Sequence, residues 1–134
     1  MIQEAYVSFE TAKLLKEKGF DENTLMVYMS YGDLCKCNRY GSIRNSNYND
    51  ITKNYFECTA PTHQMAIAWL RKKYNIYISI QPDFQSDKDF KICWCCSVNI
   101  LYENCISTKW YQCYIETYEE ATETAIKYCL EHLI

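Results

Sequence analysis

The stretch from Phe90 to Tyr102 constrains the fold of this chain most strongly, because its apolar residues recur at every second position. This alternation predicts a β-strand that is buried on one face, since successive side chains of a strand point to opposite faces. The expected inward set is Ile92, Trp94, Cys96, Val98 and Ile100, and the expected outward set is Lys91, Cys93, Cys95, Ser97 and Asn99. Related runs at 76–80 and 108–115 predict strands on either side, so we expect an antiparallel meander.

Capping signals and apolar stripes predict three helices around these strands. The first helix follows Ser8 and stops at Gly19, the second starts at Pro61 and stops at Asn75, and the third opens with a capping box at Thr117. Residues 61–134 therefore follow the order α-β-β-β-α. We expect an α+β fold, with one antiparallel sheet of about four to six strands and three helices packed mainly on one face.

The length and cysteine content bound the class of protein. A chain of 134 residues has the size of one domain, so we expect a single domain over residues 1–134. A core of this size needs no disulfides, and the cysteine count of nine is odd, so we expect reduced thiols. The chain opens without a signal-peptide pattern, and no stretch approaches transmembrane length. These features indicate a cytoplasmic protein that does not associate with membranes.

The three helical segments carry a resemblance. They read S-F-E-T-A-K-L-L-K-E-K-G-F-D-E from Ser8, A-P-T-H-Q-M-A-I-A-W-L-R-K-K-Y-N-I from Ala60, and Y-E-E-A-T-E-T-A-I-K-Y-C-L-E-H-L-I from Tyr118. Together they resemble a family of short uncharacterised proteins from gut Bacteroidales genomes and their phages or mobile elements. The resemblance implies a shared origin and fold. No activity, cofactor or catalytic residue is known for that family, so it implies nothing about chemistry.

The catalytic motifs that a single sequence can reveal are not present. There is no G-x-S-x-G, H-E-x-x-H, P-loop or dinucleotide fingerprint, and the chain has only three glycines with which to build a phosphate-cradling loop. Its two histidines, His63 and His132, lie near helix ends, where structural or solvent-facing roles are common. We therefore expect a protein that is not an enzyme and holds no cofactor.

One group of residues has the composition of a zinc site. Cys35 and Cys37 form a C-x-C pair, and Cys58 is followed after four residues by His63, which together offer four ligands of the kinds that structural zinc takes. The usual spacing is C-x2-C, and thiols in a reduced protein commonly act as small apolar side chains. A structural zinc protein is one alternative, and packing of these thiols is the competing interpretation.

The segment from Leu34 to Phe56 has the mixture of residues that binds single-stranded nucleic acid, namely basic, aromatic and amide side chains. Its candidate binding residues are Lys36, Arg39, Tyr40, Arg44, Tyr48 and Lys53. The order α-β-β-β-α is also that of a double-stranded-RNA-binding domain, but such domains start their last helix with lysines, whereas this helix starts Y-E-E-A-T-E. Because the net charge is −3, the sequence disfavours a nucleic-acid partner.

The expected sheet also predicts a surface for a protein partner. If the helices cover one face, the other face carries tyrosine and tryptophan side chains, which anchor many interfaces. The candidates are Tyr77, Trp110 and Tyr114, and the alternation does not decide which face of 108–115 is buried. The leading hypothesis is a small accessory protein, carried by a phage or mobile element, that binds a protein partner or a second copy of itself.

Overall fold

The structure is a computed structural model that describes residues 2–36, 38–39, 42–43, 47–50, 56–85 and 91–134. Two compact units make up the chain, one of residues 1–63 with Ile134 and the other of residues 64–133. The single domain expected over residues 1–134 stays a prediction, because two compact units of this size can belong to one domain or to two.

The first unit opens with helix α1 (Phe9–Glu17), which begins and ends as its capping residues predict. The Ser8 hydroxyl accepts a hydrogen bond from the backbone N–H of Thr11. At the other end Gly19 has φ +84°, and the next N–H, that of Phe20, donates to the carbonyl of Leu15. This pairing is the Schellman motif, which needs a residue in the left-handed conformation after the helix.

The described strands of the first unit are short and form two antiparallel sheets. One sheet has the order β2-β1-β5, and the other pairs β3 with β4. Their bounds are Met26–Met29 for β1, Leu34–Lys36 for β2, Asn38–Arg39 for β3, Ser42–Ile43 for β4 and Phe56–Thr59 for β5. Gly32, with φ +93°, lies in the turn of the hairpin between β1 and β2, as the Gly32-Asp33 pair predicts.

A 3-10 helix, η1 (Tyr48–Asp50), lies within the segment from Leu34 to Phe56 that the sequence suggests for nucleic-acid binding. The Asn49 amide donates to the carbonyl of Phe20 over 2.9 Å and accepts from the backbone N–H of Thr59 over 2.9 Å. These two bonds fix η1 to the end of α1 and to β5. This part of the segment is therefore an ordered piece of the first unit.

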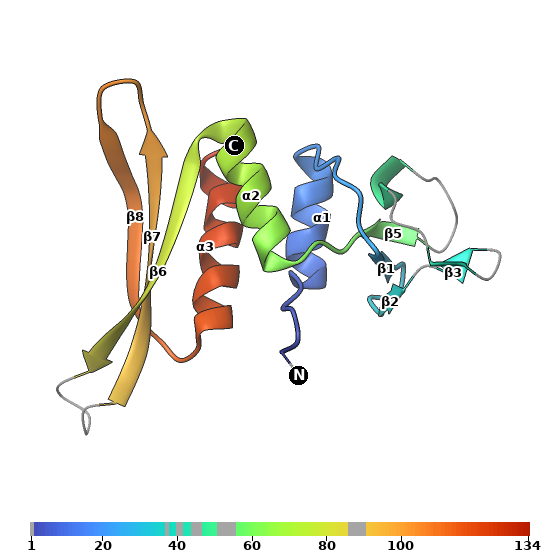
Figure 1. Ribbon diagram of the computed structural model, residues 1–134, viewed down its shortest axis with the longest axis horizontal. Coiled ribbons are helices and arrows are strands. Elements are labelled where there is room, and N and C mark those ends of the chain that lie inside the picture. The colour runs from blue at the N-terminus through green and yellow to red at the C-terminus, as the bar shows by residue number, and fades with distance from the viewer. Residues whose placement is uncertain (1, 37, 40–41, 44–46, 51–55, 86–90) are drawn as a thin grey trace. The chain divides into compact units, whose positions relative to one another are not determined.

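The second unit has the order α-β-β-β-α that the sequence predicts. Its sheet has the antiparallel order β6-β7-β8, and helices α2 and α3 lie beside it on the same side (Figure 1). The bounds are His63–Tyr74 for α2, Ile76–Gln85 for β6, Lys91–Leu101 for β7, Ile106–Ile115 for β8 and Tyr118–His132 for α3. Asn75, with φ +55°, separates α2 from β6, as expected from its left-handed preference.

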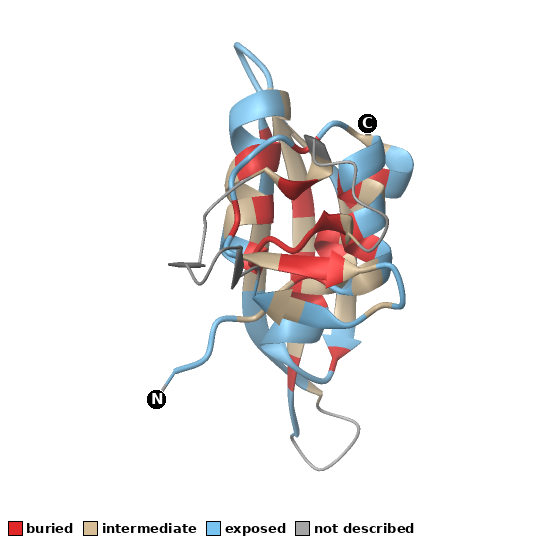
Figure 2. Ribbon diagram, turned by 90° about the vertical axis from the view of Figure 1, so that its right-hand side faces the viewer, coloured by how far each residue is buried: buried red, intermediate tan, exposed pale blue. Residues whose placement is uncertain are grey.

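Helix α3 covers the face of this sheet to which Cys96 and Val98 point. Both side chains are buried, and so is one stripe of the helix. Figure 2 colours the ribbon by burial, with buried positions in red. The buried residues of α3 are Ala121, Thr122, Ala125, Ile126, Cys129 and Leu130. Trp110 of β8 stacks on Tyr128 of α3, which places the even-numbered residue of that strand on the helix side. The face of 108–115 left open by the sequence is thereby assigned at Trp110.

The α+β class is confirmed, but the strands are not organised as one sheet of four to six. In the described part of the chain each strand pairs within its own unit, and no sheet exceeds three strands. The helices α2 and α3 lie on one face of β6-β7-β8, whereas α1 belongs to the first unit. Sequence alternation identifies strands, but the partner of each strand depends on turn geometry and register, which alternation alone does not fix.

Strand β6 continues through Pro82 to Gln85, beyond the apolar run at 76–80 that predicts it. Proline lacks the N–H that a ladder needs, and it is tolerated where one side of a strand has no neighbour. Because β6 is at the edge of the sheet and pairs only with β7, Pro82 fits opposite Trp94.

Candidate functional site

Among the residues that the structure describes, Cys35, Cys58 and His63 do not gather into a group that could hold a metal ion. In the sheet β2-β1-β5, Cys35 is level with Val27, and Cys58 is level with Tyr28. Val27 and Tyr28 are neighbours on one strand, so their side chains point to opposite faces of the sheet. The side chains of their partners, Cys35 and Cys58, therefore point to opposite faces as well. Burial raises the pKa of Cys58 to about 11, which disfavours the thiolate that a metal needs. Cys37 lies outside the described residues.

The expected nucleic-acid residues are only partly described, and Tyr48 is not available for stacking. Its side chain is 2% exposed and packs with Val27, and its ring meets that of Phe56 edge-on at 5.7 Å. A base cannot stack on a ring that is part of the core. Lys36 is exposed on β2, and Arg39 is described only in its backbone. Tyr40, Arg44 and Lys53 lie outside the described residues.

The three expected interface residues lie in different settings of the second unit. Tyr77, opposite Asn99, is on the sheet face away from α3 and is moderately exposed. Trp110 lies between the sheet and Tyr128, so its ring is partly covered. Tyr114 is 69% exposed. Of the three, Tyr114 presents the most side-chain area to a partner.

A β-bulge explains the exposure of Tyr114. Trp94 pairs with Ile115 and Cys96 pairs with Gln112, so the single residue between them on β7 faces two residues, Cys113 and Tyr114, on β8. Tyr114 is the residue of this pair with a positive φ, +64°, which is uncommon for a residue with a large side chain. Bulges redirect side chains and recur next to binding sites. Here the bulge lets Ile115 be buried while Tyr114 is exposed.

Two further large side chains accompany Tyr114 near the end of the sheet. Phe84 of β6 is 66% exposed and pairs directly with Ile92 of β7, which is 56% exposed. We name this set of three, Phe84, Ile92 and Tyr114, the apolar end. Each comes from a different strand, so three neighbouring strands contribute to one exposed apolar surface. The sequence analysis missed Phe84 and Ile92, because its strand pattern assigned Ile92 to the core.

Two hollows adjoin the apolar end and share Tyr114 as a wall. The first has a volume of about 360 Å³ and is lined by Ile92, Cys93, Tyr114 and Ile115, with the polar residues Gln85, Lys91 and Glu116 around them. Lys91 Nζ lies 3.6 Å from Glu116 Oε1 in an exposed ion pair. The second has a volume of about 490 Å³, and its lining includes the carboxylate residues Glu116, Glu120 and Glu123. We name them the apolar hollow and the acidic hollow. One suits an apolar side chain, and the other suits a cationic one.

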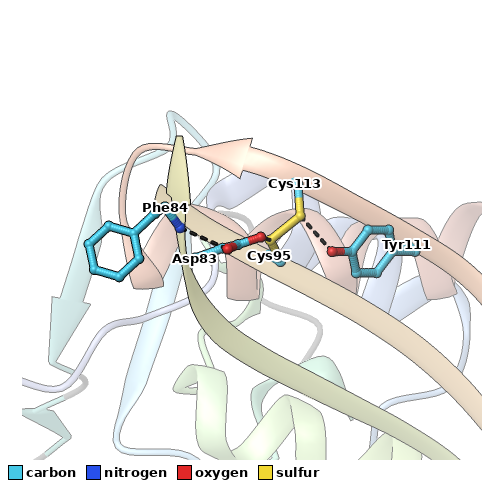
Figure 3. Close-up of a disulfide and its surroundings, with 5 residues drawn as sticks. All are labelled: Asp83, Phe84, Cys95, Tyr111 and Cys113. Carbon is cyan, nitrogen blue, oxygen red and sulfur yellow. Dashed lines mark hydrogen bonds between the residues drawn. A yellow bond between two sulfur atoms is a disulfide. The ribbon is translucent and has the colours of Figure 1, made fainter. Parts of the chain in front are cut away.

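The face of the sheet away from α3 holds a disulfide between Cys95 of β7 and Cys113 of β8 (Figure 3). Asp83 Oδ2 lies 3.7 Å from the Cys95 sulfur, and the Tyr111 hydroxyl lies 2.7 Å from the Cys113 sulfur. A disulfide sulfur carries no hydrogen, so the Tyr111 hydroxyl is the donor in this pair. The backbone N–H of Phe84 donates to Asp83 Oδ1 over 2.8 Å.

This disulfide differs from the expectation of reduced thiols. The sequence places Cys95 and Cys113 in neighbouring strands of the expected meander, but it does not give the register that sets them opposite each other. The prediction that Cys96 points away from Cys93 and Cys95 is confirmed, since Cys96 pairs with Ile80 and is buried on the helix side.

The remaining described thiols divide into buried and accessible ones. Burial raises the pKa of Cys96, and it raises that of Cys129 on α3 to about 12. Cys105 is exposed. Reactivity towards thiol reagents is therefore expected at Cys105 before Cys96 or Cys129.

Comparison with known proteins gave no matching family model, no matching curated protein and no matching solved structure. Among the helices that the structure describes, none has the length and apolar character needed to cross a membrane.

Proposed function

We propose that this protein acts by binding a protein partner through the apolar end of its second unit. The observation that carries the proposal is the exposure of Phe84, Ile92 and Tyr114 on three neighbouring strands. Soluble proteins expose single apolar side chains routinely, but a contiguous group beside a hollow is typical of an interaction site. Tyrosine and phenylalanine are also among the residues that supply much of the energy of interfaces.

The two hollows support a particular chemistry for the proposed partner. A partner segment would insert an apolar side chain into the apolar hollow, beside Ile92 and Ile115, and place a lysine or arginine in the acidic hollow. Glu120 lies in the first turn of α3, so its carboxylate is near the positive end of the helix dipole, and Glu123 lies one turn further along. The proposed partner is thus a protein segment with a basic residue next to an apolar one.

The same carboxylates disfavour a nucleic acid at this site. A phosphate backbone that approached Tyr114 would meet Glu116, Glu120 and Glu123 on one side. Repulsion between like charges in a hollow is weakly screened at low salt and opposes binding. The acidic start of α3 that the sequence shows therefore supports a protein partner.

The edges of the sheet indicate that the partner binds through side chains and does not add a strand. On β6, an edge strand, Pro82 has no backbone N–H to donate. On β8, the pairing with β7 is interrupted at two positions, between Trp94 and Cys96 and between Val98 and Asn99. Proline and bulges at edge strands are devices that prevent backbone pairing with another chain.

Capture of a partner by the tagged full-length chain tests the proposal, with one matched pair of variants. Tyr114→Ser removes a ring from the apolar end, and Tyr31→Ser removes a ring of nearly equal exposure, 68% against 69%, from the first unit. We expect a discrete protein, free of nucleic acid, to bind wild type and Tyr31→Ser. Its Kd should rise at least about tenfold for Tyr114→Ser, which corresponds to a lost hot-spot side chain.

Charge reversal tests the partner's chemistry. Glu120→Lys should weaken binding, and raising the salt concentration should weaken the wild-type complex as well, because both act on the attraction to a basic residue. Loss of binding in Tyr31→Ser to the same extent as in Tyr114→Ser would contradict the proposed surface. A mass of two chains by light scattering, returning to one chain in Tyr114→Ser, would identify a second copy as the occupant.

A further inference from the structure

We propose that Asp83, Cys95 and Cys113 form a binding site for Zn²⁺ once the disulfide between the two cysteines is reduced. Each ligand comes from a different strand of the second unit, Asp83 from β6, Cys95 from β7 and Cys113 from β8. The site uses none of the side chains of the apolar end, so it stands independently of the proposed partner binding.

The three candidate ligand atoms already lie close together. One carboxylate oxygen of Asp83 and the two sulfurs are all within 4.8 Å of one another. In a tetrahedral zinc site, bonds of about 2.3 Å to sulfur and 2.1 Å to oxygen put neighbouring ligand atoms about 3.5 Å apart. Asp83 Oδ2, at 3.7 Å from the Cys95 sulfur, already has that separation. The two sulfurs reach it by rotation of their side chains after the bond between them is cut.

Hydrogen bonds around the cluster orient two of the three ligands. The backbone N–H of Phe84 holds Asp83 Oδ1, which leaves Oδ2 directed at the sulfurs, as Figure 3 shows. The Tyr111 hydroxyl donates to the Cys113 sulfur. Such outer hydrogen bonds fix the orientation of metal ligands and are worth about 10- to 100-fold in metal affinity.

The oxidation state of the two cysteines controls the site. In the disulfide the sulfurs carry no negative charge, so they are poor ligands. When a dithiol reductant reacts, one of its thiolates attacks a cysteine sulfur and the other cysteine leaves as a thiolate. The second thiol of the reductant then displaces the first cysteine and closes a disulfide in the reductant. The reductant loses two electrons, Cys95 and Cys113 become thiols, and Zn²⁺ binding releases their protons.

The ligand types select zinc over the hard cations. Two thiolates and one carboxylate suit Zn²⁺, whereas Mg²⁺ and Ca²⁺ prefer oxygen ligands alone. Asp83 is exposed and Cys113 is partly exposed. Water therefore has access to complete a four-coordinate ion, so the site has the composition of an open zinc site.

Cobalt binding tests the proposal directly. The full chain is prepared oxidised and, separately, reduced with a dithiol that is then removed without oxygen, and each form is titrated with Co²⁺. We expect the reduced protein to bind a single equivalent with thiolate-to-cobalt absorption, which Zn²⁺ then abolishes. The oxidised protein should show no such absorption. Absence of the absorption in the reduced protein would overturn the proposal.

Variants identify the ligands. Cys113→Ser should abolish the absorption, and Asp83→Asn should weaken Co²⁺ binding by about tenfold. Cys105→Ser, which removes an exposed thiol outside the cluster, is the matched control and should bind as wild type does.

A mapping experiment on the wild-type chain does not depend on whether a variant folds. The reduced protein is alkylated with and without Zn²⁺, and the modified cysteines are found by mass spectrometry. Zn²⁺ should protect Cys95 and Cys113 and leave Cys105 reactive. Protection at other cysteines alone, or no protection at all, would refute the assignment.

Discussion

The indole ring of Trp110 stacks on the ring of Tyr128, with centroids 4.4 Å apart and planes within 7° of parallel. The contact joins β8 to the C-terminal half of α3. The next residue, Tyr111, pairs with Ser97 on the opposite face of the sheet and is exposed. Two neighbouring aromatic residues of one strand therefore have opposite roles, one in packing and one on the surface.

Replacement of these two residues should affect stability very differently. Trp110→Ala should lower the free energy of unfolding by about 2 kcal/mol, because it removes the stacked pair and part of the apolar area between α3 and the sheet. Tyr111→Ala, the control, should change it by less than about 0.5 kcal/mol, as surface substitutions do. Urea unfolding followed by circular dichroism measures both. Equal losses would show that the stack does not hold α3 to the sheet.

The start of α3 offers a second comparison. The Thr117 hydroxyl accepts a hydrogen bond from the backbone N–H of Glu120, so Thr117→Ala should cost about 1 kcal/mol. Thr117→Asp should retain most of the stability, because aspartate also caps helices. Thr124→Ala is the control: its exposed hydroxyl donates to the Glu120 carbonyl inside the helix, where alanine is a better helix former. Thermal unfolding of the three variants tests the expectation that Thr117→Ala is the least stable of them.

Local signals in the sequence predict local structure well. The caps at Ser8 and Thr117 and the left-handed residues Gly19 and Asn75 all have the expected conformations, since each depends only on its immediate neighbours. The alternation around Cys96 also predicts correctly which side faces the core. These features need no knowledge of partners distant in sequence.

The features that depend on strand register could not be predicted. Tyr114 is exposed because of a bulge, and Cys95 meets Cys113 because the register that pairs Cys96 with Gln112 sets the two cysteines opposite each other. The apolar end likewise depends on Phe84 pairing with Ile92, although the alternation alone indicates that Ile92 is buried. Register is set by turns and by contacts distant in sequence, so the candidate site became visible only in the structure.

Stability should fall at high pH, and Cys129 should contribute to that fall. Burial raises the pKa of this thiol from 9.0 to about 12, so the folded state keeps a proton that the unfolded chain releases. The contribution of this thiol to the free energy of unfolding is fully present below pH 9. It is lost as the pH rises from 9 towards 12, by about 1.4 kcal/mol per pH unit. Cys129→Ala should flatten the pH dependence of unfolding between these values, whatever it costs at neutral pH. Cys105→Ala, at an exposed thiol, should leave the dependence unchanged.

Reduction of the disulfide should destabilise the second unit. Cys95 and Cys113 are 18 residues apart in sequence, and closing a loop of that length in the unfolded chain stabilises the fold by about 3 kcal/mol. All three tryptophans, Trp69, Trp94 and Trp110, belong to this unit, so their fluorescence reports its unfolding. We expect the urea midpoint to be lower after treatment with a dithiol in wild type. The same decrease is expected in Cys105→Ser, and none in the double variant of Cys95→Ser and Cys113→Ser. An unchanged midpoint in reduced wild type would mean that the strand pairing of β7 with β8 holds this region without the covalent link.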